Sequence, residues 1–344
     1  MKLLRSTKNL VSRAVDAIEN PIPYAAPSVR FDNIVSTGST LLDLAISGKR
    51  VRGGGIPAGI VCEFFGPPGC GKTGVLNSIA AAAQKKGGDV HYDDPEKRLD
   101  LGYAHMIGAE VTEENYHFPD TVSEVFKGIW GWNPKPSQKG AICVRIEDSL
   151  AALSTELEME GEDKMGMRRA KEFSEGLRKT CRIIGKNNWI IACSNQIRSG
   201  ERGKTTTTGG FGIPFYASLR VKMLPSYPEF KLKRVVDGTE VVEGVRITCE
   251  IFKTSISSTL FHKEEIFYLF DYGIHDVWAN LEYLKDKNKN SLYLAFDKEF
   301  KAIRKAVQYI EDNNLEHELR KMVINRWEEI NIKSRIIFKP KVWF

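Results

Sequence analysis

The sequence has few cysteines and no long apolar run. Its six cysteines are scattered over 344 residues without a C-x-x-C pair, which argues against a zinc module or a disulfide framework and suits a reducing compartment. No apolar stretch approaches the roughly 20 residues that a membrane span needs. We therefore expect a cytoplasmic protein that has no membrane partner.

The composition is also not that of an intrinsically disordered chain. Hydrophobic residues make up 42% of the chain and charged residues 27%, as in an ordinary globular protein. The net charge of +6 is unevenly placed, because the basic excess lies in residues 1–30 and 277–344. The last twelve residues hold four bases and no acid. This pattern is consistent with a polyanionic partner, although it is also typical of a solvated surface.

The chain begins with an expected amphipathic helix. Val11, Val15 and Ile18 follow helical spacing. The basic, serine-containing start is similar to a mitochondrial transit peptide, but two acidic residues interrupt the basic run, which favours a packed helix. Three prolines within residues 21–27 then end the helix and make an extended linker. We expect residues 1–30 to form a separate arm.

The middle of the chain alternates apolar strands with helices. The expected strands are 59–66, 88–94, 141–148 and 189–195, and the expected helices are 72–86, a segment ending near residue 106, and 166–187. Short apolar strands between helices predict an α/β fold, with a largely parallel sheet covered on both faces. Residues 230–253 predict an antiparallel hairpin around Asp237 and Gly238. The expected core spans residues 31–276, and residues 277–344 form a small, mainly helical lobe.

The strongest motif is GPPGCGKT at residues 66–73, which fits G-x-x-x-x-G-K-[ST] between a strand and a helix. Its glycines let backbone N–H groups converge on phosphate oxygens at the helix N-terminus. In this motif Lys72 reaches the β- and γ-phosphates and Thr73 holds Mg²⁺. The predicted ATP-binding loop consists of Gly66, Pro67, Pro68, Gly69, Cys70, Gly71, Lys72 and Thr73.

Two further carboxylates complete the expected chemistry. Glu147 and Asp148 end the strand AICVRIED, and we favour Asp148 as the metal-positioning acid because it stands at the strand's carboxyl edge, although Glu147 could substitute. The strand GDVHYDD is followed by several acidic residues, and acidic residues in such positions often cap a helix. Among them we favour Glu96, just after Pro95, as the carboxylate that activates the attacking water.

The segment KTTTTGG at residues 204–210 does not have the pattern of a strand. Threonines favour strands, but the paired glycines make an ordered strand interior unlikely. Composition alone is typical of a solvated surface loop. Hydroxyls, backbone N–H groups and flanking bases could also close around a phosphodiester backbone without reading bases.

Six segments together resemble the RecA recombinase family. They are STGSTLLDLAI, GPPGCGKT, DPEKRLDLGYA, EDSLAALSTELEMEGE, SNQIR and TTTTGGFGIPFYASLR, in the family's order and spacing. The likeness covers about residues 5–276. It implies a RecA-type P-loop ATPase core, bacterial or phage-encoded, that acts in the cytoplasm of a bacterial cell or a phage-infected host.

The resemblance implies roles for individual residues. Glu96 stands where the family keeps its water-activating glutamate, and Gln196 where it keeps the γ-phosphate sensor. Tyr103 takes the place of the ring that stacks on adenine, although without the family it would be assigned to the core. Asp100 and Lys253 are further ATP-binding candidates.

The family's two DNA-binding loops correspond to about residues 157–167 and 198–214. The implied DNA-binding residues are Met165, Arg168, Arg169, Arg178, Arg198, Arg202, Lys204, Thr205, Thr206, Thr207, Thr208, Gly209 and Gly210.

The sequence departs from the family pattern at the expected subunit boundary. The family has two lysines spaced K-x-K that reach the neighbouring subunit's ATP, and here Lys253 is followed by Ser255 in the second place. A lysine–phenylalanine pair of the family reads Pro214–Phe215, so only Phe215 remains for the interface. We therefore expect hydrolysis that is slower or less dependent on DNA. The basic end replaces the family's acidic tail and predicts readier binding to duplex DNA.

The resemblance implies an ATP- and Mg²⁺-dependent recombinase. It would form a helical filament on single-stranded DNA and exchange strands with a homologous duplex, assisted by single-strand-binding or mediator proteins. A RecA-fold ring helicase shares the P-loop and Asp148. A nucleotide-switched DNA-binding accessory protein is the third reading, because the partner lysines are missing.

Overall fold

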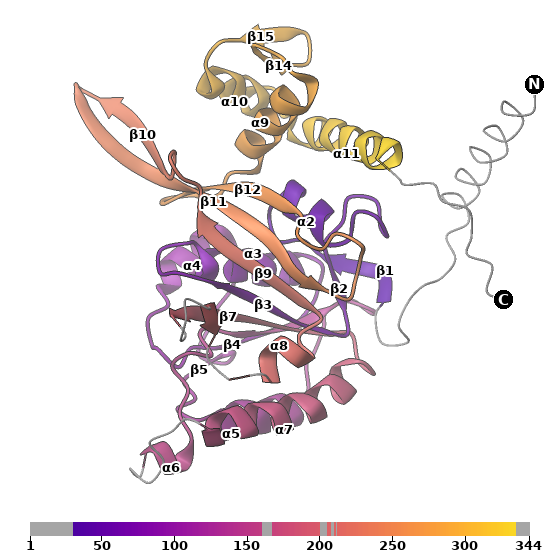
Figure 1. The fold of residues 1–344 in the computed structure, drawn as a ribbon, viewed down its shortest axis with the longest axis vertical. Coiled ribbons are helices and arrows are strands. Elements are labelled where there is room, and N and C mark those ends of the chain that lie inside the picture. The colour runs from indigo at the N-terminus through magenta and orange to yellow at the C-terminus, as the bar shows by residue number, and fades with distance from the viewer. Residues whose placement is uncertain (1–29, 160–166, 200–204, 208–209, 211, 335–344) are drawn as a thin grey trace, which may run out of the picture.

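The central element of the fold is a mixed sheet whose larger part is parallel. The computed structural model describes residues 30–159, 167–199, 205–207, 210 and 212–334, which leaves nearly all of the expected N-terminal arm and the basic end outside the description. The strand order is β13-β12-β11-β9-β3-β7-β6-β4-β5. All pairs from β9 to β5 are parallel, whereas β13, β12, β11 and β9 pair antiparallel. The predicted α/β class with an antiparallel extension is confirmed (Figure 1).

Most strands of this sheet are short, and those in the middle of its parallel part are largely buried. In spatial order they are β13 (Gly273–Ile274), β12 (Lys263–Leu269), β11 (Thr239–Thr254), β9 (Leu219–Pro225), β3 (Ile60–Gly66), β7 (Trp189–Ser199), β6 (Cys143–Glu147), β4 (Val90–Asp93) and β5 (Tyr116–His117). Strands β3 and β6 are buried at every residue, as expected for a sheet covered by helices on both faces.

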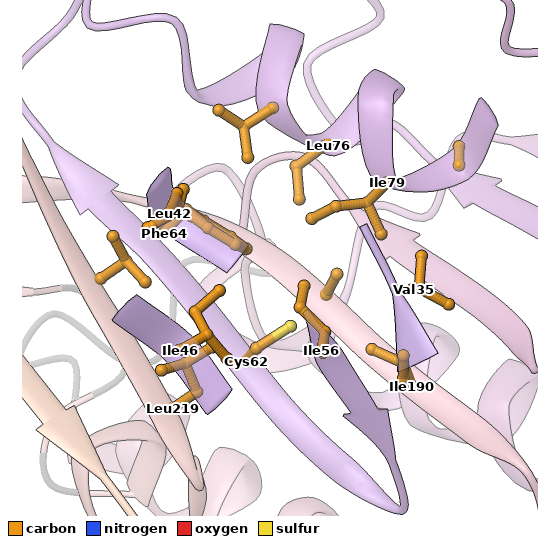
Figure 2. Packing of buried hydrophobic residues seen from close by; sticks show 14 of the residues in the cluster. Val35, Leu42, Ile46, Ile56, Cys62, Phe64, Leu76, Ile79, Ile190 and Leu219 are labelled. Atoms are coloured by element: carbon orange, nitrogen blue, oxygen red, sulfur yellow. The ribbon is translucent and has the colours of Figure 1, made fainter. Parts of the chain in front are cut away.

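Helices cover the two faces of the parallel part (Figure 1). One face carries α3 (Lys72–Lys85) and α4 (Leu101–Ile107), and the other carries α5 (Val122–Gly131) and α7 (Met167–Ile184). On the α3 face Leu42, Phe64 and Leu76 pack together from three different elements, as Figure 2 shows. Each face therefore has its own apolar layer, which fixes the sheet between them.

Local sequence explains where several helices begin. Thr121 and Glu124 form a reciprocal capping box at the start of α5, which satisfies two backbone N–H groups that the first helical turn leaves free. Asp100 caps α4 through a single hydrogen bond, which its carboxylate accepts from the Tyr103 N–H at 3.0 Å. Helix α3 is rich in alanine, the best helix former.

A long hairpin projects from the sheet (Figure 1). Strand β10 (Lys231–Val236) pairs with the first part of β11, and the turn between them holds Asp237 at φ 49° and Gly238 at φ 79°. Two successive positive φ values form the turn that matches the twist of a two-residue hairpin. The predicted hairpin around Asp237 and Gly238 is thus present.

The C-terminal lobe contains three helices and a small hairpin in the described residues. They are α9 (Asp276–Asn288), β14 (Tyr293–Ala295), β15 (Lys298–Phe300), α10 (Ile303–Asp312) and α11 (Glu316–Lys333). The β14–β15 hairpin adds to the mainly helical lobe expected from sequence. The lobe joins the core through α2 (Thr40–Ser47), because the Asp276 carboxylate accepts hydrogen bonds from both the N–H and the hydroxyl of Thr40 at 2.6 Å.

The remaining elements lie around the sheet. They are β1 (Arg30–Val35), β2 (Ile56–Ala58), α6 (Glu156–Met159), β8 (Thr205–Thr207) and α8 (Gly212–Tyr216). In the described part of the chain, no helix combines the length and the apolar character that crossing a bilayer requires.

Candidate functional site

The glycine-rich loop after β3 has the backbone that its sequence predicts. Gly69 and Gly71 have φ values of 74° and 64°, which L side chains rarely adopt. Gly66 is restricted by space instead, because a Cβ there would lie 2.1 Å from the carbonyl oxygen of Met223. The loop therefore leads into the N-terminus of α3 with backbone N–H groups available for an anion.

Lys72, the first residue of α3, lies folded over this loop. Its ammonium donates hydrogen bonds to the carbonyl oxygens of Pro67 at 2.8 Å and Gly66 at 3.2 Å. Burial lowers the pKa of Lys72, while Asp148 and Glu96 act in the opposite direction. Asp148, the predicted metal-positioning acid, and Glu96, the predicted water-activating carboxylate, therefore lie close enough to this ammonium to affect its pKa.

Thr73 and Asp148 meet at the end of the loop. The Thr73 hydroxyl donates to Asp148 Oδ2 at 2.7 Å. Ser194 donates to the other oxygen of Asp148, and the Tyr92 hydroxyl lies 3.3 Å from Oδ2. Burial raises the pKa of Asp148, and the hydrogen bonds from Ser194 and Thr73 lower it. A hydroxyl and a carboxylate at this spacing are the oxygen donors that Mg²⁺ prefers, so the residues fit that ion.

Glu147 lies on the opposite face of the sheet from Asp148. Its Oε1 accepts a hydrogen bond from Arg145 at 3.0 Å, and Arg145 also holds Asp93. Successive residues of a strand point to opposite faces. The alternative assignment of Glu147 as the metal-positioning acid therefore places its side chain away from Thr73.

Glu96 contacts Ser149, the residue that follows Asp148 in the chain. The Ser149 hydroxyl donates to Glu96 Oε1 at 2.7 Å. The turn that presents Glu96 is held by Asp94, whose buried carboxylate accepts hydrogen bonds from the N–H groups of Glu96, Arg98 and Leu99. Asp94 is thus a turn-holding residue, and it leaves Glu96 facing the same space as Lys72.

Gln196 lies next to the first residue of the loop. In the parallel pairing of β3 with β7, Gly66 is opposite Gln196. Because both strands are parallel, their carboxyl ends meet at the edge where α/β sheets bind ligands. The side chain is half-buried, and its strand continues for three more residues to Ser199.

The threonine run differs from its prediction. Thr205–Thr207 form strand β8, which pairs antiparallel with Ile197–Ser199 of β7. The expectation that no ordered strand would form there was wrong for these three residues. The physical reason is that these β-branched threonines pair with the end of β7, a contact that the local sequence does not show. The result is a hairpin built directly on the end of β7.

A buried ionic network that the sequence analysis did not identify connects this hairpin to the sheet. Arg220 forms an ion pair with Glu63 and also donates to the Thr207 hydroxyl at 3.2 Å. Glu63 accepts a further hydrogen bond from Asn195 at 2.8 Å. Glu63 and Arg220 face each other in the β3–β9 register. A charged residue in each of two apolar strands was the available sequence signal, but only the register brings them together.

The predicted adenine-stacking region contains two tyrosines. Tyr103 on α4 contacts Tyr268 on β12 through their hydroxyls. Burial raises the pKa of both phenols. Asp100 uses its carboxylate to cap α4. Tyr268 also packs over Gly74, where an added Cβ would lie 2.0 Å from its hydroxyl, so this ring borders the start of α3.

The residues at the expected subunit boundary contact each other within the chain. Lys253 donates to the carbonyl oxygens of Pro214 at 2.7 Å and Phe215 at 2.8 Å. Burial lowers the pKa of Lys253. The Phe215 side chain is 74% exposed, which is unusual for a large aromatic residue.

The predicted DNA-binding residues lie on α7, on or near the β7–β8 hairpin, and in segments outside the described part of the chain. Arg169 donates to the Leu153 carbonyl at 3.1 Å, Arg178 contacts the Tyr216 hydroxyl at 3.1 Å, and Arg168 is exposed on α7. Gly210 is described and exposed, and Arg198 is described in its backbone as part of β7. The residues of this prediction that lie outside the described part of the chain are Met165, Arg202, Lys204, Thr208 and Gly209.

The fold and this edge of the sheet define a P-loop nucleotide-binding protein. Residues 27–275 match the family described as RecA N-terminal domain. Among curated relatives, Protein RecA of Thermus thermophilus is 32% identical over 79% of each chain, and Protein RecA of Chlamydia trachomatis is 30% identical over 84% of this chain and 81% of its own. Protein RecA of Geobacter sulfurreducens is 34% identical over 65% of this chain and 63% of its own. The chain belongs to the RecA family, and the predicted resemblance is confirmed.

Proposed function

We propose that this protein is an ATP-dependent DNA recombinase that coats single-stranded DNA as a helical filament and exchanges strands with a homologous duplex. One observation supports this proposal above the others. Strand β7 carries Gln196 beside the phosphate loop, and its next three residues, Ile197–Ser199, pair with β8. The RecA resemblance assigns DNA binding to this segment. Nucleotide state and DNA contact would therefore act on one strand.

The chain's own groups are suited to hydrolysis. The loop N–H groups and Lys72 would bind the phosphates, and Glu96 would orient water and accept its proton. Thr73 and Asp148 would hold Mg²⁺, which when bound supplies charge neutralisation for the phosphates. Lys72 would exchange the carbonyls of Gly66 and Pro67 for phosphate oxygens.

DNA binding would follow from the hairpin and the loops around it. Backbone N–H groups and threonine hydroxyls contact phosphates without reading bases. Recognition of sequence would then come from base pairing between the bound strand and the duplex. Filament assembly would use the exposed Phe215 and the N-terminal arm in a head-to-tail contact that repeats without closing. Mediator or single-strand-binding proteins would act on this filament.

A nucleotide-switched DNA-binding accessory protein is a second candidate, and one observation favours it. Lys253 is held by carbonyls of its own chain, and the second lysine of the family pair is Ser255. Activation of hydrolysis across a subunit boundary would then be weak. Such a protein would bind DNA in response to ATP without exchanging strands.

An ATPase assay with and without single-stranded DNA tests the proposal. We expect single-stranded DNA to stimulate hydrolysis, and Lys72→Ala to reduce it at least about 100-fold, because removing a phosphate-binding charge costs several kcal/mol in the transition state. Lys139→Ala, an exposed lysine away from the loop, is the matched control.

Joint-molecule formation separates the candidates. Joint molecules made by the wild type but not by Lys72→Ala support the recombinase. DNA binding and ATP hydrolysis without joint molecules support the accessory protein. Closed rings on DNA in electron micrographs would contradict the filament and favour a helicase-like motor.

A further inference from the structure

Three metal-ligating side chains gather at the far edge of the parallel sheet. His91 and Asp93 lie on β4, and His117 lies opposite Asp93 on the neighbouring strand β5. Tyr92, between the first two, contacts Asp148 on the other face. Because strand residues alternate between faces, His91 and Asp93 point away from the nucleotide site.

The spacing of these side chains suits one ion. Their ligand atoms all lie within 4.8 Å of one another, and His91 Nε2 is 3.1 Å from Asp93 Oδ1. Two ligands about 2.1 Å from a tetrahedral ion lie about 3.4 Å apart. The two imidazoles stack with centroids 4.4 Å apart. Because a ring nitrogen binds a metal in the plane of its ring, the exposed His117 would rotate out of this stack to share the ion.

We propose that His91, Asp93 and His117 bind a divalent transition-metal ion of the zinc class. Imidazole nitrogen with one carboxylate oxygen is a donor set that suits Zn²⁺ and related ions, whereas Mg²⁺ requires oxygen ligands. Three protein ligands leave a fourth position, and the exposed side of His117 opens that position to water.

Groups around the cluster orient the carboxylate. Arg145 donates to Asp93 Oδ2 from Nε at 3.1 Å and also from its terminal nitrogen. The guanidinium and the ion would therefore use different oxygens of Asp93. Glu147 lies opposite Asp93 in the β4–β6 register, and its buried Oε2 has no hydrogen-bond partner among the described residues. Supporting groups of this kind fix ligand orientation and tune affinity.

We expect the bound ion to stabilise the pairing of β5 with β4 at the edge of the sheet. Strand β5 contains only Tyr116 and His117, and its described pairing with β4 spans two residues. An ion shared by His91, Asp93 and His117 would tie this short strand to β4. Its effect would appear first in stability, independently of ATP hydrolysis or DNA binding.

Calorimetric titration of Zn²⁺ into the untagged full chain tests the site. Millimolar Mg²⁺ is included so that oxygen sites such as Thr73 and Asp148 do not take up zinc. We expect one tight Zn²⁺ per chain, an affinity at least about tenfold lower in His117→Ala, and an unfolding temperature that Zn²⁺ raises in the wild type but not in His117→Ala.

His105→Ala is the matched control, because His105 is an exposed histidine on α4 outside the cluster. It should bind Zn²⁺ and be stabilised as the wild type is. Circular dichroism of both variants checks that they are folded. Equal Zn²⁺ affinity in His117→Ala and the wild type, or no tight binding in the wild type, would overturn the proposal.

Discussion

At the scale of single residues, the site depends on side chains placed by strand ends. Asp148 directly follows β6 and is held by the Thr73 and Ser194 hydroxyls, whereas Gln196 lies within β7 and is placed by backbone pairing. Gln196 lies opposite Gly66, the first residue of the phosphate loop. A side-chain amide can donate to a phosphate oxygen there and is a suitable sensor of the terminal phosphate.

We expect Gln196→Ala to lose the dependence of DNA affinity on nucleotide state. Wild-type protein should bind an oligonucleotide more tightly with a slowly hydrolysed ATP analogue than with ADP, whereas the variant should bind equally with both. Fluorescence anisotropy of a labelled oligonucleotide measures the difference. Gln138→Ala, at an exposed glutamine far along the chain, should behave as wild type. A preserved nucleotide effect in Gln196→Ala would refute the assignment.

The residues predicted from sequence are those whose motif has a local meaning. The phosphate loop, Asp148 and Glu96 each follow a strand directly, so their meeting could be expected from the parallel sheet. The Glu63–Arg220 pair was missed because its members are 157 residues apart and each lies in a largely apolar strand. Only the β3–β9 register shows that each charge has a buried partner.

At the scale of elements, the β7–β8 hairpin lies at the end of the strand that carries Gln196. Arg220 holds the hairpin through Thr207 and is itself fixed by Glu63. Buried strands such as β6 and the first part of β7 were predictable, because burial on both faces gives a continuous hydrophobic run. Short strands such as β5 and β13 were missed, since two residues contain no periodicity. Their conformation is decided by the strand beside them.

Removing the hydrogen bond between Arg220 and Thr207 tests the role of the hairpin. We expect Thr207→Val to weaken single-stranded DNA binding by about tenfold, since a hydrogen bond to a charged group contributes about 1.5–3 kcal/mol. ATP binding should remain, because the substitution leaves the phosphate loop intact. Thr239→Val, at the exposed start of β11, is the control. An unchanged DNA affinity in Thr207→Val would show that this hydrogen bond does not position the hairpin.

At the scale of the whole molecule, the expected subunit boundary is the exposed surface around α8. Phe215 is 74% exposed, and Lys253 fixes its backbone carbonyl. A large exposed aromatic residue on a rigid backbone has the character of an interface anchor. The lobe boundary near residue 277 stays a prediction from composition, and the β14–β15 hairpin within residues 277–344 was not predicted.

We expect Phe215→Ala to shorten filaments without unfolding the chain. Loss of an exposed side chain costs little folding stability, but loss of an aromatic anchor weakens association by about 2 kcal/mol or more. Sedimentation velocity with single-stranded DNA and an ATP analogue measures assembly. Tyr227→Ala, at an aromatic residue that is 77% exposed, should assemble normally. Equal assembly by all three proteins would exclude this surface from the interface.

The continuity of β7 has a consequence for timing. Its residues rise about 3.3 Å each, so the backbone from Gln196 to Ser199 spans only about 10 Å. No hinge or loop interrupts that stretch in the described chain. A rearrangement at the phosphate end would reach the hairpin as one displacement of a stiff backbone rather than through a relay of domain movements. Each protomer would then tighten or release its polynucleotide in the same event that alters its nucleotide.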